Sequence, residues 1–405
     1  MNILHLMPYS PIPLHFGGAL RVYHLLKGLV RSHEVTVVSY GTPEDARRLT
    51  DEFGGRLKDV YMLPRPWPAR HRRIGQFRAL WTPHSFFSDL LRSDAMQRTI
   101  STLLDRSEFD VVQSEFYMMG LFRLNTTAVT ILDSHNVEYD NFRRMWLNAH
   151  SPLRRLHYYL EYQRVFAEEI EVSRKHDAIF ITSARDRAIL DEHVPQVPKF
   201  VIPNGVDTAY FQPSSDTPEP YSLVFTGMMA YVPNYDGMLY FLDEVFPRIQ
   251  KAVPEAKVYI VGKRPPKELM RRASDRVIVT GYVDDVRPFI RRASVYVVPL
   301  RMGSGTRLKV LEAMAMKKPI VTTTVGCEGI DVVHGESALI ADDPQAFAHA
   351  VIELLHRADL RQTLVRNGYD LVRSSYEWSI IGEQVETVYQ TLVHPVHTEP
   401  AVEVS

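Results

Sequence analysis

The sequence is poor in cysteine, in long apolar runs and in net charge, and each shortage excludes a class of protein. Cys327 is the single cysteine among 405 residues, which excludes a framework of disulfides within the chain. With no second thiol beside it, Cys327 is expected to be structural rather than a nucleophile. No run approaches the roughly 18–20 apolar residues that a membrane-spanning helix requires. The formal net charge is −1, so nucleic acid is not an expected partner.

The remaining composition is that of an ordinary globular protein with more than one core. Apolar residues make up 45% of the chain and charged residues 23%. A chain of 405 residues exceeds what one hydrophobic core commonly supports, so two domains are expected. The first predicted strand, Asn2–Met7, begins without a basic and apolar leader, so no signal peptide is expected. We therefore expect a cytoplasmic protein, with peripheral attachment to the inner face of the cytoplasmic membrane left open.

Short apolar runs alternate with helical patterns through the first half of the chain, which predicts a doubly wound parallel sheet over residues 1–205. A helix is expected from about residue 19 to 31, and a long one over Pro152–Lys175. The predicted strands are Asn2–Met7, Glu34–Tyr40, Phe109–Gln113, Ala128–Leu132 and Ala178–Thr182, and a turn at Lys199–Gly205 closes this half.

The second half repeats the alternation after an acidic, proline-rich connector, Gln212–Pro220, which has the composition of a linker. A second doubly wound sheet is therefore predicted over residues 206–375, and a cleft between the two domains would suit two substrates. Its predicted strands are Tyr221–Thr226, Lys257–Val261, Val277–Thr280, Ser294–Leu300 and Pro319–Thr323. An apolar stripe around residues 376–394 predicts a last helix, and residues 396–405 are expected to be disordered.

Two loops of the first half are candidate binding segments. Gly17 and Gly18 stand at a helix entrance, where they would let backbone approach a ligand, although a plain turn requirement explains them equally well. Arg21 in the first helical turn is a candidate acceptor contact or a solvated side chain. His135 follows the strand at Ala128–Leu132, and ligands sit at the carboxyl ends of parallel strands. His135 is thus a candidate for chemistry, with a hydrogen-bonded core histidine as the alternative.

Residues 60–88 contain no Asp or Glu but hold five arginines, two tryptophans and three phenylalanines. Basic residues interleaved with aromatics can dock on an anionic lipid surface. The same mixture also suits a loop over an acceptor cleft or a packed pair of helices. A peripheral membrane contact through this segment is therefore one of three interpretations.

The most informative stretch is residues 299–318, in which a buried strand leads through a small-residue loop into a helix. The loop is Gly303–Thr306, and a helix that opens on such a loop presents free N–H groups to an anion. Arg307 and Lys309 add two cations, and Glu312 lies a turn further on, where a carboxylate can accept from a diol. These groups together suit a nucleotide sugar, with its diphosphate at the loop and its ribose at Glu312. An ordinary strand–helix unit with solvated charges is the alternative.

Motifs along nearly the whole chain resemble the GT-B glycosyltransferases, specifically the retaining family 4 group. They include VIPNGVD at 201–207, LEAMA at 311–315 and the late helix carrying Trp378. DSHNVEY at 133–139, VFTGMMAYVPNYD at 224–236 and GSGTRLKVLEAMA at 303–315 are similar to a subset linked to exopolysaccharide and exosortase-associated sugar transfer. The resemblance implies two Rossmann-like domains facing a cleft, with the C-terminal helix crossing back to the first domain.

The resemblance also implies a reaction: transfer of a sugar, with retention, from a UDP- or GDP-linked donor to a hydroxyl of a saccharide or lipid-linked acceptor. We predict catalytic roles for His135, Arg307 and Lys309, and no cofactor or metal. Closure of the domains would bring Gly17, Gly18 and His135 to the donor. Donor binding is further predicted for Gly227, Tyr282, Val283, Ser304, Gly305, Thr306 and Glu312.

Two departures from the family's pattern leave rival functions open. The family usually has two acids eight residues apart, but Ser304 stands where the first is expected, ahead of Glu312. The usual Arg and Lys after the first strand of the second domain are replaced by Met228 and Pro233. Because the leaving diphosphate needs positive charge, Arg307 and Lys309 are assigned that task. A nucleotide-sugar epimerase and a catalytically inactive sugar-nucleotide-binding protein remain as alternatives.

Overall fold

The computed structural model describes residues 1–14, 17–66, 84–149, 151–303 and 305–394. The chain divides into two compact units, one made of Met1–Ile202 with the residues from Ile381 onward, and one made of Pro203–Ile380. Each unit is described by itself. Among the described helices, none combines the length and apolarity needed to cross a membrane. The predicted tail at 396–405 and most of the 60–88 segment lie outside the described residues.

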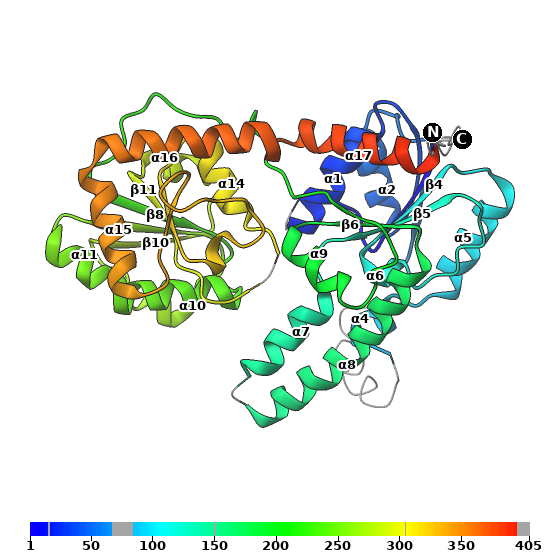
Figure 1. Ribbon diagram of the computed structural model, residues 1–405, viewed down its shortest axis with the longest axis horizontal. Coiled ribbons are helices and arrows are strands. Elements are labelled where there is room, and N and C mark those ends of the chain that lie inside the picture. Colours follow the sequence, from blue (N-terminus) through cyan, green and yellow to red (C-terminus); the bar gives the residue numbers. More distant parts are fainter. Residues whose placement is uncertain (15–16, 67–83, 150, 304, 395–405) are drawn as a thin grey trace, which may run out of the picture. The chain divides into compact units, whose positions relative to one another are not determined.

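The first unit is built on a parallel sheet with seven strands among its described residues, in the order β3-β2-β1-β4-β5-β6-β7 (Figure 1). Every neighbouring pair is parallel, and the strands are rich in buried Val and Ile, as parallel strands covered on both faces require. The strands are β1 Asn2–Met7, β2 Glu34–Tyr40, β3 Asp59–Leu63, β4 Val111–Glu115, β5 Val129–Ser134, β6 Ala178–Ile181 and β7 Lys199–Val201. Sequence reasoning missed β3, an edge strand whose residues alternate weakly, and it missed β7, because Lys199–Gly205 was predicted as a turn.

Helices cover both faces of this sheet, and the long helix predicted over Pro152–Lys175 is present with those bounds as α8. Helix α2 shows how the local sequence sets an end: the Thr42 hydroxyl accepts from the Asp45 N–H, and the Asp45 carboxylate accepts from the Thr42 N–H. The other helices are α1 Gly17–Leu29, α2 Pro43–Glu52, α4 Phe86–Leu91, α5 Asp94–Arg106, α6 Phe116–Met119, α7 Glu138–Leu147 and α9 Ala184–Asp191.

The second unit repeats the architecture with six described strands in the order β10-β9-β8-β11-β12-β13. All of these pairs are parallel as well. The strands are β8 Ser222–Thr226, β9 Lys257–Val261, β10 Val277–Gly281, β11 Val295–Val298, β12 Ile320–Thr322 and β13 Leu339–Ile340. The five predicted strands are confirmed, whereas β13 was missed because two residues give no readable period.

Between β8 and β9 the chain forms three consecutive helical segments rather than one regular helix. A π-helical turn, Phe241–Val245, separates α10 Val232–Tyr240 from α11 Phe246–Ala252. Pro247 lies in the first turn of α11 and has no N–H to donate, which interrupts the regular hydrogen-bond pattern there. The remaining helices of this unit are α12 Lys267–Met270, α13 Arg287–Arg292, α14 Leu308–Ala315, η3 Val325–Cys327, α15 Pro344–His356, α16 Ala358–Leu371 and η4 Val372–Tyr376.

The last helix, α17 Trp378–Val393, belongs to both units, because the division falls between Ile380 and Ile381. Its part from Ile381 onward packs in the first unit, where Tyr389 is fully buried and stacks on Phe180 at a ring-centroid distance of 5.9 Å. The Tyr389 hydroxyl donates to the side chain of Gln113 on β4. The sheet order of each unit reverses direction beside its first strand, between β1 and β4 and between β8 and β11. Ligands bind at such points, outside the carboxyl ends of the strands.

Candidate functional site

The predicted loop and helix after β11 form the site of the second unit, beside the point where the strand order reverses. Gly303 and Gly305 have φ values of 116° and 75°, which L side chains rarely adopt, so the loop depends on glycine there. The helix that follows is α14, Leu308–Ala315, with Arg307 at its N-cap position. Ser304, predicted to bind donor, lies outside the described residues.

Arg307 is buried beneath this loop rather than extended into solvent. Its Nε donates to the carbonyl of Val325 at 3.0 Å, and one terminal nitrogen lies 3.7 Å from a Glu328 carboxylate oxygen. A Cβ added to Gly303 would lie 3.2 Å from both terminal nitrogens of Arg307. The guanidinium therefore packs directly against the glycine loop and gives it positive potential from below.

Lys309 reaches from α14 to the loop after β8. Its Nζ donates to the Asn234 side-chain oxygen at 2.7 Å and lies 4.1 Å from the ring centroid of Phe225. A Cβ on Gly227 would come within 2.9 Å of the same Nζ, so a glycine at 227 leaves room for the ammonium group. Burial, and then the nearby positive charge of Arg307, lower the pKa of Lys309 to about 7.

Glu312 lies on the same helix, three residues after Lys309. Burial raises the pKa of its carboxyl group to about 7, an effect that Lys309 opposes. Close by, Thr226 at the end of β8 shares a 2.5 Å hydrogen bond with the hydroxyl of Tyr296 on β11. Burial raises the pKa of Tyr296, and the charge of Glu312 raises it further. An acid and a base with pKa values near neutrality thus share one helical turn, a pattern frequent at functional sites.

The other predicted donor residues of the second unit lie around this centre with different degrees of support. The Thr306 hydroxyl accepts from the Asn204 side chain at 3.2 Å, which ties the VIPNGVD segment to the glycine loop. Tyr282, just after β10, is 69% exposed, whereas Val283 is half-buried against the core. No contact places either of them against a nucleobase, and their predicted role stays a prediction.

In the first unit, His135 belongs to a buried polar network at the carboxyl ends of β1, β4 and β5. Glu115 at the end of β4 lies between two histidines, with 2.6 Å to His135 Nε2 and 2.5 Å to His5 Nε2. Burial by itself would raise the pKa of Glu115, but the hydrogen bonds from His135 and His5 hold it below the usual range. Phe116 stacks on the His135 ring at 3.8 Å between centroids. The structure is compatible with both interpretations of His135. It is hydrogen-bonded, as a core histidine would be, and it lies at the carboxyl ends of the strands, where a residue that contacts the substrate would be expected.

Arg21 requires a correction. The alternative of a solvated side chain is wrong, because Arg21 is fully buried and donates to both carboxylate oxygens of Asp133, at 2.8–3.1 Å. It also donates to the carbonyl of Ile202 at 2.8 Å. Arg21 thus holds α1 against β5 and the end of β7, which is a structural role, and its acceptor contact stays a prediction.

Gly17 and Gly18 are the first two residues of α1 and are half-buried. This position at a helix N-terminus agrees with a ligand-facing loop and with a plain turn, so their donor role stays a prediction. Cys327 is buried in η3, and burial raises the pKa of its thiol to about 11, as expected for a structural cysteine.

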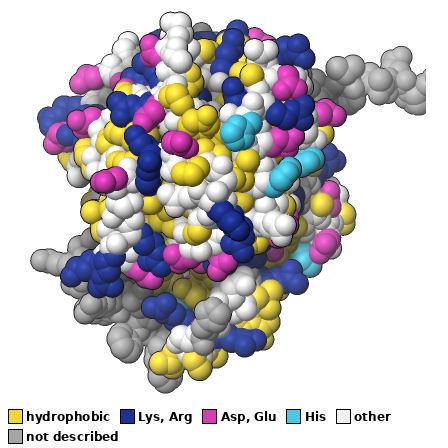
Figure 2. Space-filling model, turned by 90° about the vertical axis from the view of Figure 1, so that its left-hand side faces the viewer, with side chains coloured by type: hydrophobic (Ala, Val, Ile, Leu, Met, Phe, Trp, Pro, Cys, Tyr) yellow, Lys and Arg dark blue, Asp and Glu magenta, His cyan; other side chains and the backbone are white. Residues whose placement is uncertain are grey.

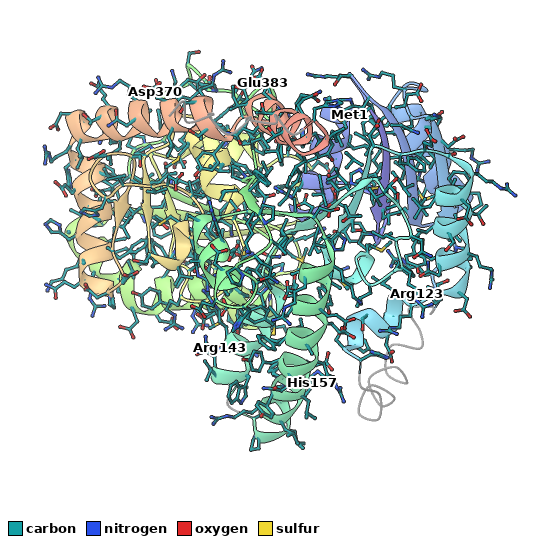
Figure 3. The ribbon with its side chains drawn as sticks, turned by 45° about the vertical axis from the view of Figure 1, so that its right-hand side comes forward. Met1, Arg123, Arg143, His157, Asp370 and Glu383 are labelled. Atoms are coloured by element: carbon teal, nitrogen blue, oxygen red, sulfur yellow. The ribbon has the colours of Figure 1, made fainter. Side chains whose placement is uncertain are left out.

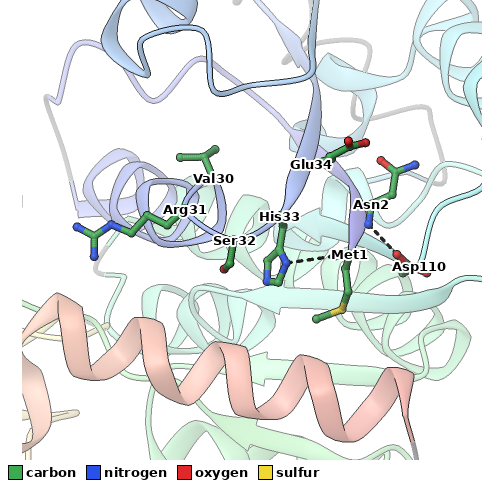
Figure 4. A pocket seen from close by; sticks show the side chains of 8 residues that line it. All are labelled: Met1, Asn2, Val30, Arg31, Ser32, His33, Glu34 and Asp110. Carbon is green, nitrogen blue, oxygen red and sulfur yellow. Dashed lines mark hydrogen bonds between the residues drawn. The ribbon is translucent and has the colours of Figure 1, made fainter.

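Two features of the described residues are set aside as sites. Glu115, Asp133 and His135 could surround a cation, but Asp133 is already paired with Arg21, and the Glu115 oxygens already lie within hydrogen-bond distance of His5 and His135. A cavity of about 460 Å³ lies among Met1, His33 and Asp110, where His33 faces the chain's amino group (Figure 4). It opens at the amino ends of β1 and β2, the edge opposite to the one that binds ligands in such sheets.

Glu115, Asn234 and Asn204 were not singled out from the sequence, although each contacts a predicted site residue. Glu115 ends a buried strand, which is a signal that could have been read. Asn234, in the first turn of α10, and Asn204, in a loop, follow no such rule, because only the fold brings these two to Lys309 and Thr306.

Comparison with known proteins supports the same assignment in both halves of the chain. Residues 17–210 match the family described as Glycosyltransferase Family 4, and residues 220–357 match the family described as Glycosyl transferases group 1. An uncharacterized 44.6 kDa protein of the Klebsiella pneumoniae cps region is 21% identical, over 91% of this chain and 94% of its own length. A phosphatidyl-myo-inositol mannosyltransferase of Mycobacterium leprae is 29% identical, over 47% of this chain and 53% of its own length.

Among solved structures, Anabaena HepE in complex with UDP superposes with a TM-score of 0.71 at 13% identity, covering 96% of this chain and all of that one. Two doubly wound parallel sheets, matched by glycosyltransferase families in both halves, define a glycosyltransferase of the GT-B class. Within that class the chain is a family 4-type glycosyltransferase, which confirms the predicted family, fold class and enzyme class.

Proposed function

We propose that this enzyme transfers a sugar, with retention of configuration, from a nucleotide-diphosphate sugar to a hydroxyl of a saccharide or lipid-linked acceptor in bacterial polysaccharide or glycolipid synthesis. The observation that carries the donor part is the packing of two cations against glycines of two neighbouring loops, Arg307 against Gly303 and Lys309 against Gly227. Burial first, and then the positive charge of Arg307, lower the pKa of Lys309, and a bound anion would offset both effects. A diphosphate supplies such an anion.

In this proposal the donor lies on the second unit, outside the ends of β8 and β11. The loop around Gly305 and Thr306 faces the diphosphate together with Gly227. Lys309 neutralises the charge that develops on the leaving phosphate, and Arg307 adds to the potential from beneath the loop. Glu312 accepts from the ribose hydroxyls, and Tyr282 and Val283 flank the base.

The proposed chemistry follows from the leaving group. Departure of the phosphate generates an oxocarbenium-like sugar, and the acceptor hydroxyl attacks from the same face while the phosphate takes its proton. The bond between anomeric carbon and phosphate oxygen breaks, and a glycosidic bond to the acceptor oxygen forms. No protein nucleophile and no metal step is invoked. His135 is proposed to contact the sugar from the first unit through the ring that Glu115 orients.

The relatives support the type of donor and acceptor by their names alone. The Anabaena structure contains UDP, the Mycobacterium leprae relative is named a phosphatidyl-myo-inositol mannosyltransferase, and the Klebsiella pneumoniae relative is named for a cps region. A uridine donor is thus the first to test, and the sugar is left to experiment.

A thermal-shift screen of nucleotide diphosphates and their sugars tests donor binding first. A ligand that binds only the folded state raises the unfolding midpoint by mass action. At a ligand concentration of a hundred times Kd, the free energy of unfolding rises by about 2.7 kcal/mol. The best donor is then incubated with and without lipid-linked saccharide acceptors, and the anomeric configuration of the product is read by NMR. Inversion at the anomeric carbon would contradict the proposed retention.

The same assay separates the alternatives. An epimerase would change the donor sugar without any acceptor, and an inactive binding protein would show the thermal shift with no product from any acceptor. Neither alternative is favoured by the matches to known proteins, which are to glycosyltransferase families in both halves.

A further inference from the structure

The hairpin formed by α7 and α8 ends in a group of exposed leucines that the proposed chemistry does not use. We call residues 141–160 the hairpin tip. Leu153 is 81% exposed, Leu156 is 56% exposed and Leu147 is 54% exposed, with every residue from Ser151 to Leu156 exposed. Single exposed leucines are common on soluble proteins, but a group of them at one end of a hairpin marks an interaction surface.

The tip also carries charge of one sign only. Residues 141–160 include four arginines and no Asp or Glu. Arg144 pairs with Asp140 at 3.0 Å, while Arg143, Arg154 and Arg155 are exposed and have no ion pair among the described residues. Figure 3 shows Arg143 on α7 and His157 on α8 near the same end of the hairpin. By contrast, the face seen in Figure 2 has acidic and basic side chains interspersed over most of its described surface.

Contacts between α7 and α8 hold the hairpin together within the tip and at its base. Trp146 on α7 packs against Tyr159 and Tyr162 of α8, at 5.0 and 6.0 Å between ring centroids. Buried Glu169 on α8 accepts from the N–H groups of Glu138 and Tyr139 at 3.1 and 2.9 Å, and so caps the start of α7. Figure 1 shows the two helices projecting from the sheet of the first unit.

We propose that the hairpin tip docks on the surface of an anionic lipid bilayer, with Leu153 and Leu156 entering the acyl boundary. Arg143, Arg154 and Arg155 would lie among the phosphate headgroups. Leucines beside arginines without ion pairs favour binding to such a surface. Burial of the apolar side chains and attraction of the cations to the negative surface potential both contribute to the binding free energy. A second copy of the chain is a poorer occupant, since its own arginines would face these. Phosphate groups of nucleic acid would leave the leucines in water.

This inference does not depend on the proposed transfer reaction, and it differs from the contact predicted for residues 60–88. A flotation experiment tests it with vesicles of phosphatidylcholine and phosphatidylglycerol, two parts to one, against phosphatidylcholine alone. Leu153→Ser with Leu156→Ser should lower the partition coefficient about tenfold or more, because two apolar side chains are lost from the boundary. Arg154→Gln with Arg155→Gln should lower it about tenfold on the anionic vesicles only, with a fall on adding salt.

Matched control variants carry the same chemical changes elsewhere. Met270→Ser with Val333→Ser removes two exposed apolar side chains of the second unit, and Arg98→Gln with Arg106→Gln removes two exposed cations from α5. Both controls should keep the wild-type partition coefficient. Thermal midpoints of all four variants should match the wild type, because the changed side chains are exposed.

A site-specific label supplies a second readout. Because Cys327 is buried, a polarity-sensitive dye can be attached to Leu153→Cys, with Val333→Cys as the matched position. The dye at 153 should shift to the blue on adding anionic vesicles, and the dye at 333 should not. Absence of vesicle binding by the wild type, equal binding by the leucine variant, or a dimer that the leucine variant dissolves in sedimentation would each overturn the proposal.

Discussion

At the scale of single residues, Lys309 and Glu312 are the groups whose protonation should govern donor binding. The pKa of Lys309 is lowered to about 7, so its charge is lost as the pH rises through that value. The pKa of Glu312 is raised to about 7, so its charge is lost as the pH falls through the same region. Both groups are in their charged form together only near neutral pH.

We therefore expect the affinity for the tightest nucleotide sugar of the screen to peak near neutral pH and to fall on both sides. A diphosphate requires the ammonium form of Lys309, and ribose hydroxyls donate best to the carboxylate form of Glu312. Lys309→Arg should abolish the alkaline fall, since a guanidinium stays charged. Glu312→Gln should abolish the acidic fall. Calorimetric titration across the pH range gives both profiles, and an Arg variant with the wild-type profile would remove Lys309 from the site.

Arg307 is the second residue-scale test. Replacing it by Ala should lower turnover about 10²-fold, because the positive potential under the loop acts on the charge that develops in the transition state. Arg307→Lys should retain more activity than Arg307→Ala. Arg276→Ala is the matched control, since Arg276 precedes β10 at the amino edge of the same sheet. A wild-type rate for Arg307→Ala, with the loop intact by its thermal midpoint, would end the assignment.

At the scale of elements, the ends of β8, β9 and β10 are packed through glycine backbone. Gly227 donates to the Val261 carbonyl at 3.0 Å, and Gly262 donates to the Gly281 carbonyl at 3.1 Å. A Cβ at Gly262 would lie 1.7 Å from the carbonyl oxygen of Gly227, which is backbone and cannot rotate away. The position of the donor loop after β8 therefore depends on the absence of a side chain at Gly262, the residue that follows β9.

Gly262→Ala should destabilise the second unit by about 3 kcal/mol and weaken donor binding, because the loop carrying Gly227 must move. Gly382→Ala in α17 is the control, since nothing lies within 4 Å of a Cβ there and alanine favours helix. Chemical denaturation and the thermal shift with nucleotide measure the two effects. Equal stability of both variants would show that the strand ends adjust without cost.

At the scale of the whole molecule, α17 returns the end of the chain to the first unit. Its buried residues there are Ile381, Val385 and Tyr389, and the Glu386 carboxylate lies 2.5 Å from His33 Nε2. The helix thus supplies core side chains to a sheet whose last strand, β7, ended at Val201.

Tyr389→Ala should destabilise the first unit by about 3–5 kcal/mol, through a cavity and an unpaired Gln113 side chain. Hydrogen exchange should accelerate in β4 and β6 and stay unchanged in β8 and β9. Gln384→Ala, exposed on the same helix, is the control. Equal acceleration in both sheets would contradict an effect confined to the first unit.

Local pattern was sufficient for most elements of this protein. The bounds of α8, the alternation of strand and helix and the loop before α14 follow from apolar period, proline and glycine, which act within a few residues. Strands β3, β7 and β13 escaped prediction. β3 is an edge strand with little period, β7 has three residues inside the stretch predicted as a turn, and β13 has two residues. The sequence left Arg21 open between an acceptor contact and a solvated side chain, and its buried ion pair could not be foreseen because the partner, Asp133, lies 112 residues away.

Local composition and spacing were enough to predict the class of fold and the charged residues near the donor loop, because both depend on residues close together in the chain. The partners of those charged side chains depend on the tertiary structure. The reversal of strand order brings β4 beside β1 and β11 beside β8, so Glu115 meets two histidines and Lys309 meets Asn234. Contacts between segments far apart in the chain have no local signature, and the burial that they produce is the main cause of the shifted pKa values of Lys309 and Glu312.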